Sequence, residues 1–138
     1  MPDQTTTGAA VAESLTRYEE EHGDPTPAIY ARFYAAHPDA EELFGGDTLM
    51  PRRMMSEIFA TIIDIADGTL DAAHATTWIA DHIAYEVTRP MLTTMFAIIV
   101  DVMREGLGDA WDRTTESEWT DVMSRWSAAA LTAFDEQS

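Results

Sequence analysis

Apolar side chains recur at spacings of three and four residues along nearly the whole chain, and no stretch alternates apolar and polar residues as a half-buried strand does. Glycine and proline interrupt this pattern at intervals. The spacing predicts a short helical turn after Pro38 and longer helices at about 9–21, 27–37, 51–67, 70–85, 91–107 and 116–134. The sequence therefore predicts an all-α protein.

The chain has 138 residues, enough to bury the core of one domain without disulfides or metals. Residues 1–8 are polar and are expected to form a flexible N-terminal tail, and residues 9–136 form the predicted domain. The middle of the 91–107 helix is apolar nearly all round, which predicts a central position. The third and last long helices are expected to bury Met54, Ile58, Ile62 and Ile65, and Trp119, Val122, Met123, Trp126, Ala130 and Phe134.

The charge is strongly negative, with 25 acidic residues against eight basic ones, and all eight are arginine. A net charge of −17 argues against nucleic acid and against anionic membrane surfaces, because both require basic patches. Two explanations stay open. The carboxylates keep the surface hydrated at high salt, where their repulsion is screened, or a GC-rich genome disfavours lysine codons.

Targeting and redox signals are few. The stretch "MPDQTTTGAAVAE" has neither the basic residues nor the apolar core of a signal peptide. No window approaches the roughly 18 uncharged apolar residues of a membrane span. Cysteine is absent, so disulfides and thiolate metal sites are excluded. We expect a soluble cytoplasmic protein without a membrane partner.

The stretch "TTWIADHIAYEV", residues 76–87, places one histidine among mostly apolar or small residues. His82 follows Trp78 by four residues and precedes Tyr85 by three, on the apolar side of the predicted helix. His74 is more than two turns away, so the two histidines cannot chelate one ion. His82 is therefore either a core histidine or the single axial ligand that a haem iron requires.

Three stretches in this order and spacing resemble a known family: "IYARFYAAHPDAEELF", "WIADHIAYEV" and "REGLGDAWDRTTESEW". From about Ala9 to Phe134 the chain resembles a bacterial globin of the single-domain, flavohaemoglobin-like branch. The resemblance implies a globin fold of six to eight helices around a haem pocket. It also implies haem b (protohaem IX), because c-type attachment needs cysteine.

The resemblance assigns roles to individual residues. It places His82 as the proximal iron ligand, Val87 at the haem edge, Tyr30 at the distal tyrosine position and Phe44 against the haem face. Tyr30 has an alternative role as an interior aromatic residue whose hydroxyl bonds to backbone, and Phe44 would look the same as a simple core residue.

The sequence departs from the family at two positions. Met54 stands where a distal histidine or glutamine is common, and its sulfur cannot donate a hydrogen bond to a ligand. Met54 either lines the cavity or binds the iron as a sixth ligand. Leu92 replaces the tyrosine that supports the proximal histidine in this branch, which puts peroxidase-like chemistry in doubt.

Further pocket residues are expected from their helical spacing, although a plain core would show the same set. These are Ile58, Ile62, Trp78, Met91, Met95, Phe96 and Ile99. Arg52 and Arg53 either meet the haem propionates or form a solvated pair near local acids.

The resemblance implies reversible binding of O₂, or of NO or CO, for oxygen binding, storage or transport. Two alternatives stay open. The first is an NO dioxygenase that detoxifies NO with an external reductase, since this sequence carries no reductase domain. The second is a haem-free module with the globin fold. The chain is expected to be a monomer or a homodimer.

Overall fold

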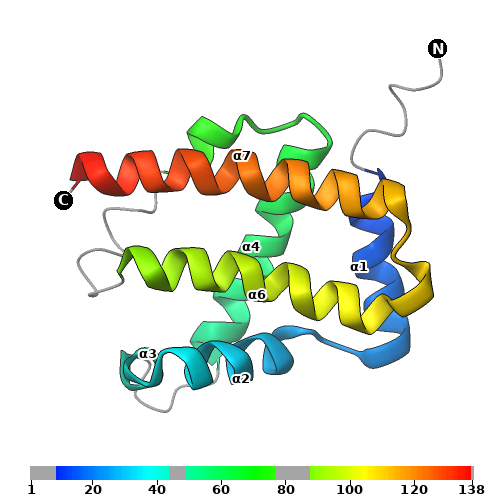
Figure 1. The fold of residues 1–138 in the computed structure, drawn as a ribbon, viewed down its shortest axis with the longest axis horizontal. Coiled ribbons are helices and arrows are strands. Elements are labelled where there is room, and N and C mark those ends of the chain that lie inside the picture. The colour runs from blue at the N-terminus through cyan, green and yellow to red at the C-terminus, as the bar shows by residue number, and fades with distance from the viewer. Residues whose placement is uncertain (1–8, 44–48, 77–87, 138) are drawn as a thin grey trace.

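The computed structural model describes residues 9–43, 49–76 and 88–137, and all regular structure within these ranges is helical (Figure 1). The all-α prediction is confirmed for this part of the chain. The elements are α1 (Ala9–His22), α2 (Thr26–Ala36), α3 (Pro38–Leu43), α4 (Leu49–Ala66), η2 (Ala72–Thr76), α6 (Arg89–Leu107), η3 (Gly108–Ala110) and α7 (Arg113–Gln137).

Glycine ends two of the helices, as the sequence predicts. Gly23 follows α1 with φ 82°, and Gly68 follows α4 with φ 86°. This left-handed conformation favours glycine because a Cβ atom would clash with the backbone. Asp24 then accepts a hydrogen bond from the Thr26 backbone N–H at 2.9 Å, which starts α2.

The last helix begins at Arg113, three residues before the predicted start at Glu116. Asp112 accepts hydrogen bonds from the Thr115 backbone N–H at 2.9 Å and from the Thr115 hydroxyl at 2.8 Å. These bonds hold the pKa of the Asp112 carboxyl below its usual range. The capped position adds nearly one turn to the N-terminal end of α7.

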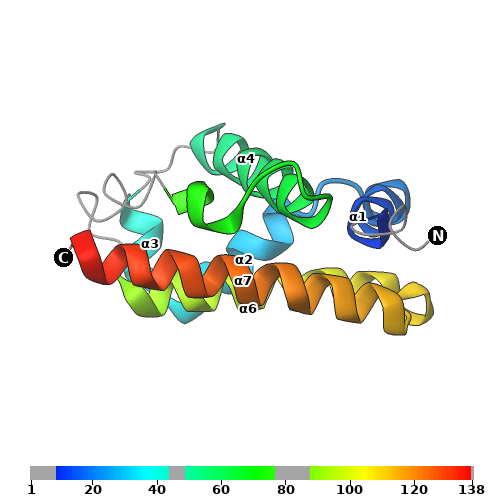
Figure 2. The ribbon, with the colours of Figure 1, turned by 90° about the horizontal axis from the view of Figure 1, so that it is seen from above.

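The helices are arranged around an antiparallel pair. α6 and α7 lie side by side, joined by η3, and α4 crosses them on one side (Figures 1 and 2). α2 packs against α6, η2 packs against α7, and α1 contacts α4, α6 and α7. None of the described helices is long and apolar enough to cross a membrane.

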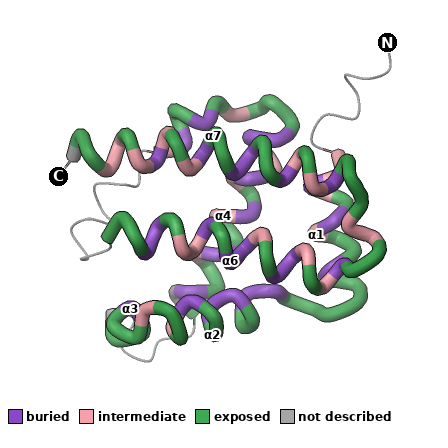
Figure 3. The backbone as a smooth tube through the Cα atoms, viewed as in Figure 1, coloured by how far each residue is buried: buried purple, intermediate pink, exposed green. Residues whose placement is uncertain are grey.

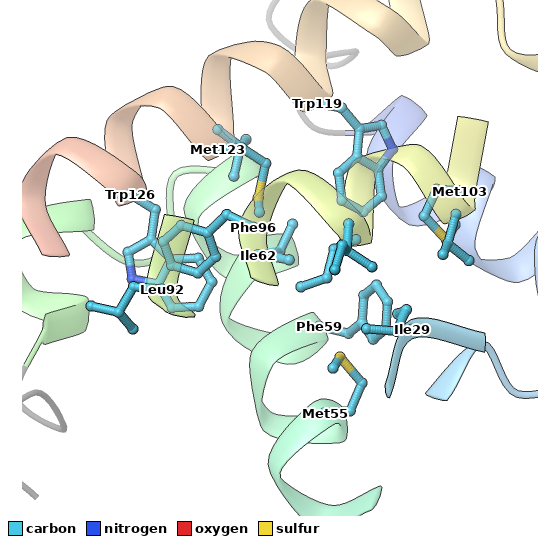
Figure 4. Close-up of a cluster of buried hydrophobic side chains, with 14 of the residues drawn as sticks. Ile29, Met55, Phe59, Ile62, Leu92, Phe96, Met103, Trp119, Met123 and Trp126 are labelled. Atoms are coloured by element: carbon cyan, nitrogen blue, oxygen red, sulfur yellow. The ribbon is translucent and has the colours of Figure 1, made fainter. Parts of the chain in front are cut away.

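Buried residues occur on all the long helices, α1, α2, α4, α6 and α7 (Figure 3). Figure 4 shows Met55 and Phe59 of α4 beside Ile29 of α2. In the first half of α4, the buried positions are shifted by one residue from the predicted ones. Met55 and Phe59 are buried, whereas Met54 and Ile58 are half-buried.

Other predicted core positions are confirmed. Ile62 and Ile65 of α4 are buried, and in α7 Phe134 alone of the predicted set is half-buried. α6 is buried along a wide face but exposes a strip at residues 93, 97, 101 and 105. It is therefore not enclosed on all sides.

The predicted 70–85 helix differs from the structure in its first part. Residues 72–76 form a 3₁₀ helix, and Ala75 departs from helical geometry with φ −88° and ψ 24°. Residues 77–85 of this prediction lie outside the described residues. The Ala75 carbonyl accepts a hydrogen bond from the Trp126 indole N–H of α7 at 3.0 Å.

α1 and α6 approach each other closely at Gly106. A Cβ atom built on Gly106 would lie 2.2 Å from Cε2 of the Tyr18 ring, so the α6 backbone itself packs against that ring. Next to it, His22 Nε2 donates a hydrogen bond to the Gly106 carbonyl at 2.7 Å. Glycine is required at this position by the space available.

The turn between α6 and α7 is held by side chains from both helices. Glu116 accepts a hydrogen bond from the Trp111 indole N–H at 2.6 Å and also bonds the Arg104 guanidinium. These donors hold the pKa of the Glu116 carboxyl below its usual range, the indole N–H most strongly. Arg104 also lies over the Trp111 ring, 5.6 Å from its centroid. We call Arg104, Trp111 and Glu116 the corner cluster.

A buried hydrogen bond connects α1 with α7, and its removal gives a first prediction. The Trp119 indole N–H donates to Ser14 Oγ at 2.8 Å, and both residues are buried. Ser14→Ala leaves this N–H without its acceptor, so we expect the free energy of unfolding to fall by about 1–3 kcal/mol. Urea unfolding of Ser14→Ala, of Trp119→Phe and of the double variant checks this. The double variant should lose less than the sum of the single losses, and simple additivity would contradict it.

Candidate functional site

The predicted site residues fall into two groups. His82, Phe44, Trp78 and Val87 lie outside the described residues. The structure describes the other five, which come from three helices: Tyr30 on α2, Met54 and Ile58 on α4, and Leu92 and Phe96 on α6. α2 contacts both α4 and α6, so Tyr30 belongs to the helix between the other two.

Tyr30 is buried near two other aromatic rings of α2. Its ring centroid lies 6.4 Å from that of Phe33, edge-on, and 5.5 Å from that of Tyr34. Burial raises the pKa of the Tyr30 hydroxyl far above its usual value, with a further contribution from Tyr34. The hydroxyl is therefore protonated at neutral pH and able to donate a hydrogen bond.

Met54 and Ile58 form a partly open apolar stripe on α4. They are four residues apart, so they share one face of the helix, and both are half-buried. The fully buried Met55 and Phe59 lie on the adjacent stripe. α4 thus presents more apolar surface than the core of the protein covers.

Leu92 and Phe96 are buried on α6, one turn apart. The Phe96 ring stacks on the Trp126 indole of α7, with centroids 4.9 Å apart and planes at 28°. Leu92 lies beside both rings in Figure 4. The position at which this branch would carry a tyrosine is thus an apolar one.

Residues 77–87 are flanked by two elements that are both attached to α7. Before them, the Trp126 indole N–H donates to the Ala75 carbonyl of η2 at 3.0 Å. After them, Thr88 accepts a hydrogen bond from the Met91 N–H and begins α6, and Arg89 forms an ion pair with Asp135 of α7.

The other three histidines have surroundings unlike those of an iron ligand. His22 is exposed and bonded to the Gly106 carbonyl. His37 is partly buried and bonded to the Thr94 hydroxyl at 3.0 Å. His74 is exposed on η2. Among the described histidines, none is buried in the core.

Arg52 and Arg53 lie in the first two turns of α4, and both are exposed. Arg52 lies 3.7 Å from the Asp24 carboxylate, which agrees with the interpretation that it balances a local acid. Within the described ranges no three His, Asp or Glu side chains are grouped to hold a metal ion. A haem iron needs only one protein ligand, so its site would not form such a group.

Two hydrogen bonds that hold the fold together were not predicted from the sequence. The Asp112 cap has a recognisable signal, an acid followed by threonine and glutamate in "DRTTE". The Trp126–Ala75 hydrogen bond has none, because its acceptor is a backbone carbonyl 51 residues away. Trp126 was predicted only as a core residue.

Comparison of the chain with protein-family models, with curated proteins and with solved structures finds no match.

Proposed function

We propose that the protein binds haem b at His82, within a globin fold, and reversibly binds O₂, or NO or CO, in the haem pocket. The observation that supports this best is the stretch "WIADHIAYEV", whose resemblance to the globin F helix places His82 as the iron ligand. The described histidines add a weaker argument. His22 and His74 are exposed and His37 is only partly buried, so none of the three lies in the core.

The described residues fit a flat apolar group. Met54 and Ile58 offer partly open apolar surface on α4, and a bound porphyrin would cover it. Leu92 and Phe96 of α6 are buried, and Phe96 stacks on Trp126 of α7, so these two residues supply an apolar wall rather than open surface. Each of these side chains would also occur in an ordinary protein core. The support for the proposal therefore comes from the number of apolar side chains and from the half-buried state of Met54 and Ile58 on α4.

A ferrous haem supplies one open iron coordination position for a diatomic ligand. The chain supplies the surroundings that decide what this position does. His82 would hold the iron from one side, and Tyr30 would donate a hydrogen bond on the other. Apolar side chains of α4 and α6 would exclude water from the pocket.

Leu92 favours binding over turnover. As a buried apolar residue it gives no hydrogen bond to the proximal side, where a tyrosine would strengthen electron donation to the iron. We therefore place reversible binding ahead of NO dioxygenation.

The visible absorption spectrum tests the function directly. We expect purified protein titrated with haem to develop a sharp Soret band at one haem per chain, and this band should shift when dithionite and CO are added. The ferrous spectrum before CO should be five-coordinate, and a six-coordinate one that Met54→Leu abolishes would instead assign Met54 as a ligand. A protein that takes up no haem would overturn the proposal.

Tyr30→Phe gives a prediction for the distal side. Phenylalanine keeps the ring and its contacts with Phe33 and Tyr34 but removes the hydroxyl donor. One lost hydrogen bond of about 1.4 kcal/mol corresponds to roughly tenfold faster O₂ dissociation. Stopped-flow dissociation measures it, with CO as the control, because CO accepts a hydrogen bond more weakly. Equal O₂ dissociation rates would assign the Tyr30 hydroxyl to a structural role.

A further inference from the structure

We propose that α1 is sensitive to ionic strength: it docks onto α6 and α7 when salt screens its negative charge, and it detaches locally when salt is low. This behaviour belongs to the fold and does not depend on haem binding. α1 lies at the end of the molecule where α6 turns into α7, and it contacts both helices (Figures 1 and 2).

Few buried side chains attach α1 to the rest of the protein. Its buried residues are Val11, Ser14 and Tyr18, three of 14, whereas α6 buries eight of its 19 residues. A helix of this length is marginal in water without tertiary contacts. Elements with few buried apolar contacts open at a low free-energy cost, so α1 is suited to local opening.

Hydrogen bonds to distant residues complete the attachment of α1. The Trp119 indole donates to Ser14, the Ala10 backbone N–H donates to Glu118 at 3.0 Å, and His22 donates to the Gly106 carbonyl at 2.7 Å. The partners in each of these bonds are at least 84 positions apart in the sequence. The three bonds therefore form only when α1 docks.

The charge of α1 opposes this docking. The helix carries four glutamates, Glu13, Glu19, Glu20 and Glu21, against one arginine, Arg17, and all five side chains are exposed. With His22 neutral, the net charge of α1 is −3, and the rest of the chain carries the other −14 of the total of −17. Docking thus brings α1 toward a body of the same sign.

Three of the glutamates lie at the unfavourable end of the helix. Glu19, Glu20 and Glu21 fall in the last turn of α1, where the backbone carbonyls carry partial negative charge. A carboxylate near a helix C-terminus destabilises the helix, most strongly at low ionic strength. The three side chains therefore weaken the same turn that His22 attaches to α6.

The end of α6 offers little positive charge in return. Gly106 lies in the last turn of α6, so its bond with His22 brings two helix C-terminal ends together. Arg104 is the basic residue of that turn, and it already pairs with Asp101 at 2.9 Å and with Glu116 at 3.2 Å. Salt reduces the range of charge repulsion from about 30 Å at 0.01 M to about 3 Å at 1 M. Added salt should therefore favour the docked state.

Amide hydrogen exchange of peptides from α1 tests this directly. Wild type and two triple variants are compared at one pH, in about 0.02 M and about 1 M NaCl. The α1 variant is Glu19→Gln, Glu20→Gln and Glu21→Gln, and the control is Asp39→Asn, Glu41→Gln and Glu42→Gln. The control removes the same charge from exposed positions of α3, where Asp39 and Glu41 lie in the first turn, at a helix end of the opposite sign.

In the wild type, we expect exchange within residues 9–22 to slow about tenfold between low and high salt, and exchange within α4 to change less. One carboxylate near a helix C-terminus shifts the local equilibrium about twofold at low salt, so three give about tenfold. The α1 variant should therefore exchange slowly already at low salt, and the control should behave as the wild type does.

A last comparison replaces NaCl with tetramethylammonium chloride at the same ionic strength. Screening predicts equal protection in both salts, whereas an effect of sodium alone would mean a bound cation and would overturn the proposal. Exchange of α1 that does not depend on salt overturns it as well. So does an equal gain of protection in the α1 variant and in the control, because net charge rather than the end of α1 would then be the cause.

Discussion

His82→Ala is expected to abolish stable haem binding. The imidazole is the proposed protein ligand of the iron, and no other described histidine is placed to replace it. Removal of a residue that hydrogen-bonds a metal ligand typically weakens metal affinity by roughly 10–100-fold. Removal of the ligand itself should weaken affinity by more. Haem titration followed at the Soret band measures the effect.

His74→Ala is the matched control. His74 is exposed and lies eight residues before His82, so its loss should leave the haem titration unchanged. Circular dichroism of the haem-free variants separates a lost ligand from a lost fold, because His82→Ala should keep its helical signal. A normal ferrous–CO spectrum in His82→Ala would refute the ligand assignment.

Gly106→Ala is expected to destabilise the protein, although alanine is the better helix former. The added methyl would lie 2.2 Å from Cε2 of the Tyr18 ring, so that buried ring or the α6 backbone must move. Overpacking of this kind costs about 1–3 kcal/mol, against a helix-propensity gain of about 1 kcal/mol for alanine over glycine. Urea unfolding should therefore show a net loss.

A double-mutant cycle makes this prediction sharper. In a Tyr18→Ala background the ring that blocks the methyl is gone, and Gly106→Ala should then stabilise the protein by its helix propensity. The effect of the same substitution thus changes sign between the two backgrounds. A destabilisation of equal size in both would show that the Tyr18 contact is not its cause.

The sequence predicts the helices well because their signals are local. Gly23 and Gly68 end α1 and α4 where the pattern breaks, and Asp24 begins α2. Such signals depend on residues within four positions of each other. Helix positions therefore follow from the sequence without knowledge of the tertiary structure.

The buried face of α4 shows where local reasoning stops. Met54 and Ile58 form one apolar stripe, and Met55 and Phe59 form a second one directly beside it. Periodicity marks both stripes equally. Packing against α1, α2 and α7 decides which of them enters the core, and these helices are distant in the sequence.

The candidate site also has features that the sequence predicts and one that it does not. Phe96 was chosen from its helical spacing, and its burial agrees with that choice, whereas Tyr30 and Leu92 were chosen from the family resemblance and are buried as well. The Trp126–Ala75 contact could not be foreseen, because a backbone carbonyl carries no residue identity and its availability comes from the kink in η2.

The corner cluster has a consequence for the order in which the protein folds. Arg104 and Glu116 are separated by 12 residues, so their contact closes a small loop at little entropic cost. By contrast, Trp126 meets Ala75 across 51 residues, and Trp119 meets Ser14 across 105. The α6–α7 hairpin should therefore form early, and η2 and α1 should dock onto it later. The contacts that join α1 and η2 to α7 would then be among the last to form.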